Sequence, residues 1–197
     1  MLVVFRRIGQ RRYAVEVQRP PFPDLEMKPA PGYDPFLPHD LMHMVVEAQL
    51  GLKHAVFGQL AAGGDSGTFH IIVKPDEGSR KTTRVQRSVK ARGRKLLREG
   101  RDECLQSERA TYICWQEWLA RSRSTEQRKL SQSMAEQAKQ VRGVGSAGES
   151  DKLSGRKLAE ICERLDEFSS LWSRLEVGQG MTVRWPDLAI VDNPENS

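Results

Sequence analysis

The sequence predicts an α+β fold, in which a small antiparallel sheet carries a histidine-bearing helix beside a long antiparallel helical hairpin. Three observations lead to this class. Two β-rich runs at the N-terminus are separated by a turn, and a third such run lies near the C-terminus. Most of the chain from 101 to 175 has helical periodicity instead. At 197 residues, the chain is long enough to bury a sizeable core.

The periodicity divides the chain into four parts. These are an α+β head (1–75), a basic linker or helix (76–100), a helical hairpin arm (101–176), and a returning strand with a flexible tail (177–197).

Composition limits the classes of function. The net charge of +5 permits anionic partners without requiring them. No stretch reaches the roughly 20 apolar residues of a membrane span, so no membrane partner is expected. The three cysteines lack the spacing of a metal site, which favours a reduced, cytoplasmic protein.

The head begins with a hairpin. Residues 2–8 and 12–18 are rich in β-branched and aromatic residues, and Gly9 lies in the turn between them. Residues 19–38 contain seven prolines, which remove amide donors and predict a long loop lying over a site. A helix then starts near Pro38 and stops at Gly51.

The rest of the head alternates short elements. "HAVFGQLAA" predicts a second short helix, and "TFHIIV" (68–73) predicts a buried strand. Near the C-terminus, "MTVRW" alternates apolar and polar residues, and we expect it to return to the N-terminal sheet.

Three helices are predicted in the arm, at roughly 101–121, 125–141 and 151–175. The last one carries a heptad seam, which predicts a hairpin whose turn lies near Gly143–Gly148. A protein partner or a homodimer using this hairpin is the alternative use of the seam. Its six apolar residues are Leu158, Ile161, Leu165, Phe168, Trp172 and Leu175.

The most specific chemical pattern lies in the first helix. His39 and His43 are four residues apart, so both imidazoles lie on one face and can share a divalent metal such as zinc. Glu47 follows His39 by eight residues, or about 12 Å along the helix axis, which is too far for one metal to span. It is better placed to orient His43. The candidates for the third ligand are His54, His70 and Asp65.

The string His39-Asp40-Leu41-Met42-His43 is similar to the HExxH signature of the zincin metallopeptidases. The resemblance implies zinc ligation by the two histidines and Asp40 as the catalytic general base of a hydrolase. The longer segment "LPHDLMHMVVEAQLGLKHAVFGQLAAGG" resembles a family of uncharacterised bacterial proteins over residues 1–75, which implies no particular activity. The structural alternative is a helix that covers a small sheet, with two histidines in a polar groove.

A basic stretch suggests a different class of function. Residues 80–98 hold nine Lys or Arg residues and no acidic residue. On a helix, Arg84, Arg87, Arg94 and Arg98 share one broad face that can follow a nucleic-acid backbone. The run has no aromatic residue, so base stacking is not indicated. The alternative is that these charges pair with the acidic residues of the hairpin. The two hypotheses are therefore a metal-dependent protein and a non-enzymatic interaction protein.

Overall fold

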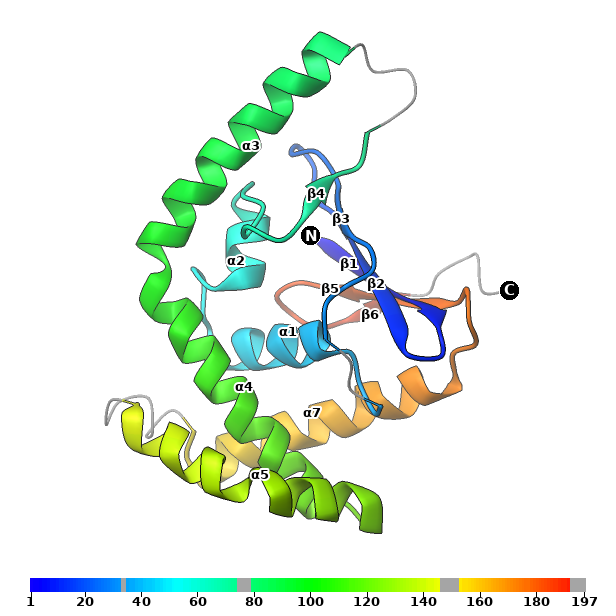
Figure 1. The fold of residues 1–197 in the computed structure, drawn as a ribbon, viewed down its shortest axis with the longest axis vertical. Coiled ribbons are helices and arrows are strands. Elements are labelled where there is room, and N and C mark those ends of the chain that lie inside the picture. The colour runs from blue at the N-terminus through cyan, green and yellow to red at the C-terminus, as the bar shows by residue number, and fades with distance from the viewer. Residues whose placement is uncertain (33–34, 74–78, 146–152, 192–197) are drawn as a thin grey trace.

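The structure, a computed structural model, describes residues 1–32, 35–73, 79–145 and 153–191 (Figure 1). Within these ranges it consists of six helices and one six-stranded antiparallel sheet. The α+β class predicted from the sequence is therefore confirmed.

The sheet joins the two ends of the chain. Its order is β4-β3-β2-β1-β5-β6, and every neighbouring pair is antiparallel. The predicted N-terminal hairpin and the returning C-terminal strand are both confirmed, because β5 pairs with β1. The strands are β1 (Leu2–Gly9), β2 (Arg12–Gln18), β3 (Leu25–Met27), β4 (His70–Ile71), β5 (Gly180–Arg184) and β6 (Ile190–Val191).

Two predictions about strands need correction. The proline-rich segment is not entirely loop, since β3 lies between Pro23 and Pro29 and pairs with β2. The predicted strand at 68–73 is reduced to the two residues of β4, and His70 is exposed. β4 is the edge strand and β3 lies next to it, and both are too short to show a periodic pattern in the sequence.

Helix α1 (His39–Leu50) begins and ends at the predicted signals. Pro38 is its N-cap residue, and Gly51 ends it in the left-handed conformation with φ of 67°. Its middle is buried on all sides, from Leu41 to Glu47. The short helix α2 (Val56–Ala61) follows.

The long helices wrap around one side of the sheet and α1 (Figure 1). Helix α3 (Ser79–Glu99) and helix α4 (Arg101–Arg121) are joined at Gly100 by hydrogen bonds of helical spacing. Together they follow a curved path around the sheet and α1 (Figure 1). Helix α5 (Thr125–Val144) folds back along α4, and helix α7 (Gly155–Arg174) packs against α4 and α1.

The helical hairpin is therefore α4–α5, with its turn at 122–124. A pairing of α5 with α7 through a turn at Gly143–Gly148 was the wrong choice, and part of that segment lies outside the described residues. Helix α7 packs against α1 and α4 because those helices have the larger apolar surface facing its seam. Among the described residues, α5 has only its narrow stripe of Ser131, Met134 and Ala138 buried.

The seam of α7 is used within the chain. Leu158, Ile161, Leu165, Phe168 and Trp172 are buried, and Leu175 is partly buried against the same cluster. The predicted use of the seam within the chain is therefore confirmed. The seam is covered mainly by side chains of the same chain.

One hydrophobic cluster runs through the molecule. It contains residues of β1, β2, β5, α1, α4 and α7, so the sheet and the long helices share a core. No helix in the described ranges is both long and apolar enough to cross a membrane.

Candidate functional site

The structure places His39, Asp40 and His43 on the wall of one cavity of about 340 Å³ between α1 and α4. The proline-rich loop and the turn before β4 supply its other walls. The described lining residues are Met27, Pro31, His39, Asp40, His43, Val56, Ser66, Thr68, Leu97, Cys104 and Glu108. A cavity of this size with several convergent polar groups is of the kind that holds small ligands.

The two histidines lie side by side, as the spacing of four residues requires. Their ring centroids are 4.7 Å apart, with the rings edge to face at 72°. The other edge of the pair is closed by Trp115 of α4, whose ring centroid lies 6.4 Å from that of His39. His43 is buried, whereas His39 is partly exposed at the cavity.

A chain of hydrogen bonds fixes the ring of His43. The Ser107 hydroxyl donates to Glu47 Oε1 at 2.8 Å, so the Ser107 oxygen accepts from Nδ1 of His43 at 2.9 Å. Thr111 Oγ1 lies 3.2 Å from the same nitrogen. With the proton placed on Nδ1 by this network, Nε2 carries a lone pair toward the cavity.

His43 is neutral in the folded protein. Burial, followed by the charge of His39, lowers its pKa to about 3. Its Nε2 lies 3.7 Å from Oε2 of Glu108. Because the imidazole is neutral, this contact is not an ion pair. The lone pair of Nε2 is thus available to a cation or to a proton from a ligand.

Glu47 is linked to His43 through Ser107 rather than by a direct hydrogen bond. Its carboxylate also accepts from the backbone N–H groups of Val56 at 3.2 Å and Phe57 at 2.9 Å. Burial nevertheless raises the pKa of Glu47 to about 7. Glu47 therefore anchors both α2 and, through Ser107, the imidazole of His43.

Asp40 faces the same cavity but already has a partner. The Tyr13 hydroxyl of β2 donates to Asp40 Oδ2 in a short hydrogen bond. Removal from water raises the pKa of Asp40, although the Tyr13 hydrogen bond acts in the opposite direction. The sheet thus positions the carboxyl that the sequence singled out.

The three further ligands suggested by the sequence do not join the histidine pair. The backbone N–H of His54 donates to Glu103, and His54 is exposed. Asp65 accepts a hydrogen bond from the backbone N–H of Gly67 within its own turn. His70 lies opposite Glu26 in the register of β4 and β3. Across the described ranges, no three His, Cys, Asp or Glu side chains are gathered closely enough to hold a metal ion.

Helix α4 contributes residues to the site that the sequence analysis did not find. Cys104, Ser107, Glu108 and Thr111 follow helical spacing, so they lie on one face toward α1. Their signal in the sequence is the spacing of three and four residues, which places them on one face of the helix. Cys104 is not an activated nucleophile, because burial and the nearby Glu47 raise the pKa of its thiol.

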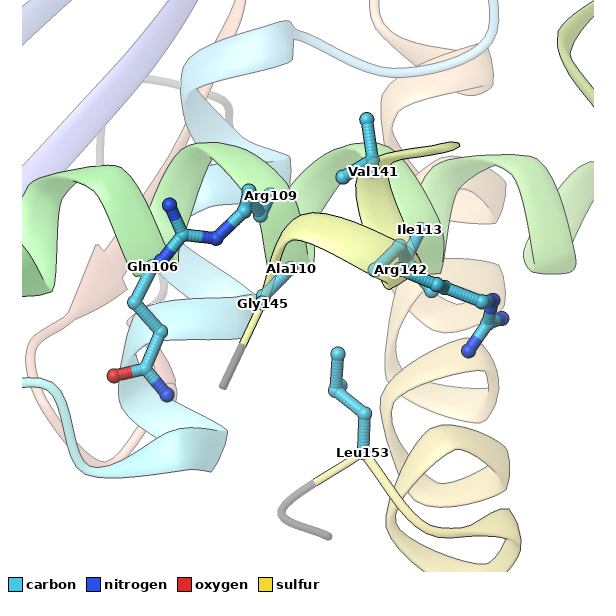
Figure 2. Close-up of a pocket in the computed structure, with 8 residues that line it drawn as sticks. All are labelled: Gln106, Arg109, Ala110, Ile113, Val141, Arg142, Gly145 and Leu153. Atoms are coloured by element: carbon cyan, nitrogen blue, oxygen red, sulfur yellow. The ribbon is translucent and has the colours of Figure 1, made fainter. Parts of the chain in front are cut away.

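A second cavity lies against other residues in the same half of α4 and is much smaller. Figure 2 shows it between α4, the C-terminal end of α5 and Leu153, with Gln106 and Arg142 on its rim. Its volume of about 20 Å³ accommodates about one water molecule. Of these two cavities, the one beside the histidines is the better candidate for a ligand site.

Searches against protein-family models, curated proteins and solved structures found no match to this chain.

Proposed function

We propose that this protein binds a divalent transition metal, zinc above all, in the cavity beside α1. His39 and His43 are the nitrogen ligands, and Glu108 of α4 is the carboxylate ligand. The observation that carries the proposal is the pair of adjacent imidazoles on the cavity wall, with the Glu108 carboxylate 3.7 Å from Nε2 of His43.

The state of His43 supports this role. A ligating histidine must be neutral, and its second nitrogen is usually held by a hydrogen bond that fixes the ring. His43 meets both conditions, since Nδ1 is bound to Ser107 and the pKa is about 3. Glu47 accepts a hydrogen bond from the Ser107 hydroxyl and thereby holds that hydroxyl in place.

The third ligand requires a movement of Glu108. The three groups are not already gathered at one point among the described residues. The Glu108 side chain is 68% exposed, so a change of rotamer carries no packing cost. Two imidazoles and one carboxylate are a ligand set that zinc accepts.

The first prediction is that the metal-free protein, without a histidine tag, binds one Zn²⁺ in a calorimetric titration. We expect Glu108→Gln to weaken binding by about 10-fold to 100-fold, the range associated with disturbed metal sites. His39→Ala and His43→Ala should abolish it. His70→Ala is the matched control, because His70 is exposed on β4 and does not line the cavity.

Glu108→Gln is the decisive variant because it changes one exposed atom and leaves the core intact. Equal zinc affinity of the Glu108→Gln variant and the His70→Ala variant would contradict the assignment of Glu108. Zinc stoichiometry unchanged in both His39→Ala and His43→Ala would contradict the site as a whole.

We propose hydrolysis as the reaction of the zinc-loaded protein, with Asp40 as its general base. The raised pKa of Asp40 brings this carboxyl closer to the neutral range in which a general base is most effective. Asp40→Asn should then abolish hydrolysis of an activated ester while zinc binding persists. Equal hydrolysis by both proteins would remove Asp40 from the reaction.

A further inference from the structure

Helix α3 concentrates the positive charge of the protein. It holds nine of the 31 basic residues but only one of the 26 acidic residues, so the remaining chain has 22 basic and 25 acidic residues. The net charge of +5 therefore combines a helix of +8 with a body of −3. In Figure 1, α3 forms one flank of the molecule, and its N-terminal end extends away from α2.

The arginines singled out by the sequence face away from the body. At about 100° per residue, Arg84, Arg87, Arg94 and Arg98 fall within an arc of about 80°. The opposite side of α3 contains Val89 and Gly93, which are buried. All four arginines are exposed, and their row is about 21 Å long at 1.5 Å per residue.

The acidic residues of the hairpin do not neutralise this row. Among the described residues, the ion pair of α3 is Lys95 with Glu99, and the four arginines have no carboxylate within pairing distance. Arg92 differs from them, since its guanidinium lies 4.8 Å above the ring of Phe22. The four arginines therefore do not pair with the acidic residues of the hairpin, which was the alternative use of the basic stretch.

We infer that the outer face of α3 is a binding surface for the phosphate backbone of a nucleic-acid duplex. A row of unpaired guanidiniums is complementary to regularly spaced phosphates. The described part of the helix has no aromatic side chain on which single-stranded bases stack. A membrane surface fits less well, because the apolar side of α3 is turned into the protein and cannot enter a bilayer.

The second prediction concerns the salt dependence of this binding. We expect a short mixed-sequence duplex to bind with a log–log salt slope of about −3.6 or steeper, one contact for each of the four arginines. Affinity should then fall roughly 100-fold between about 50 mM and about 200 mM salt. Fluorescence anisotropy of the labelled duplex measures both quantities with the full chain.

Two double variants distinguish binding by α3 from a general effect of the protein's net charge. Arg87→Gln with Arg94→Gln should make the slope shallower by about 1.8 and weaken binding at low salt. Lys129→Gln with Lys139→Gln removes the same charge from exposed positions of α5 and should leave the slope unchanged. Circular dichroism confirms that both variants remain folded.

Three results would overturn the inference. The first is an absence of duplex binding at low salt. The second is an equal loss in both double variants, which would mean that only net charge matters. The third is binding to anionic phospholipid vesicles without binding to the duplex, which would assign the face to a membrane surface. None of these results depends on zinc, so this test is independent of the one at the cavity.

Discussion

Glu47 and His43 are buried ionisable residues whose titrations act in opposite directions. The pKa of Glu47 is raised to about 7 from an ordinary 4.5, so its neutral form stabilises the fold at low pH. That contribution is lost as the pH rises through this window. The pKa of His43 is lowered to about 3 from 6.5, so its contribution is lost as the pH falls.

The third prediction follows from this opposition. Between the ordinary pKa values of glutamate and histidine, the two effects nearly cancel in the metal-free protein. Glu47→Gln removes one of them, so its unfolding free energy should fall on acidification by up to about 1.4 kcal/mol per pH unit. Denaturant titrations across this pH window measure the slope directly.

The reciprocal variant is the control for this prediction. His43→Gln leaves Glu47 to titrate alone, so stability should fall as the pH rises instead. If Glu47→Gln retains the pH dependence of the parent protein, then Glu47 does not hold a proton in the folded state, and the assigned shift is wrong.

Arg19 is a single buried side chain that holds irregular backbone segments in place. It is 2% exposed, and its guanidinium donates to the carbonyls of Pro23, Leu60 and Gly64. A cation at the C-terminal end of α2 interacts favourably with the carbonyls left free there. Burial lowers the pKa of Arg19 to about 10, which still leaves it charged at neutral pH. Arg19 thereby holds the proline-rich loop against the second helix.

At the scale of elements, the junction of α3 and α4 depends on close approach of the backbone. A Cβ atom at Gly100 would lie 2.0 Å from the carbonyl oxygen of His54 and 3.0 Å from Nε2 of Gln59. The backbone of Gly100 has φ of −96°, which any residue can adopt. Space, rather than conformation, therefore requires glycine at this point.

The fourth prediction compares two glycine substitutions in the long helices. Gly100→Ala should cost about 1–3 kcal/mol, as overpacking usually does, because α4 must move away from the segment before α2. Gly143→Ala lies near the end of α5, where nothing is within 4 Å of the new Cβ. It should be neutral or stabilising by up to about 1 kcal/mol through helix propensity.

Thermal unfolding of the two alanine variants beside the parent protein provides the measurement. A Gly100→Ala protein as stable as Gly143→Ala would show that α3 and α4 are not held against His54. The same comparison bears on the cavity, because Leu97 and Cys104 line it on either side of the junction.

At the scale of the molecule, the core has no boundary between the sheet and the helices. Trp172 of α7 contacts Tyr13 of β2, with ring centroids 6.4 Å apart, and Arg7 of β1 lies over its ring at 4.8 Å. Leu165, near the middle of the same helix, is fully buried. The loss of one packing contact in α7 is thus transmitted to the sheet.

The fifth prediction is that Leu165→Ala destabilises the entire protein in a single transition. The transfer and cavity terms predict a cost of about 2–5 kcal/mol. Tryptophan fluorescence and far-ultraviolet circular dichroism should shift together, because one core unfolds cooperatively. Leu175→Ala, at a partly buried position, should cost less. Separate transitions for the two signals would mean that the helices unfold independently of the sheet.

The sequence by itself determined the elements whose signals are local. Alternation predicted the N-terminal hairpin and the strand near Val183, and Pro38 and Gly51 predicted the ends of α1. The heptad seam predicted the burial of α7, and the spacing of four residues predicted that His39 and His43 lie together. Periodicity fixes which face of an element is apolar, because that depends only on the geometry of the backbone.

Only the tertiary structure decided what each face meets. The seam of α7 meets α1 and α4 rather than α5, and β3 forms because β2 offers it an edge. Ser107 reaches His43 across 64 residues of sequence, and Glu108 comes with it, whereas His54, Asp65 and His70 are carried elsewhere. Such contacts depend on how several helices pack at once, so a pattern within one helix contains no information about them.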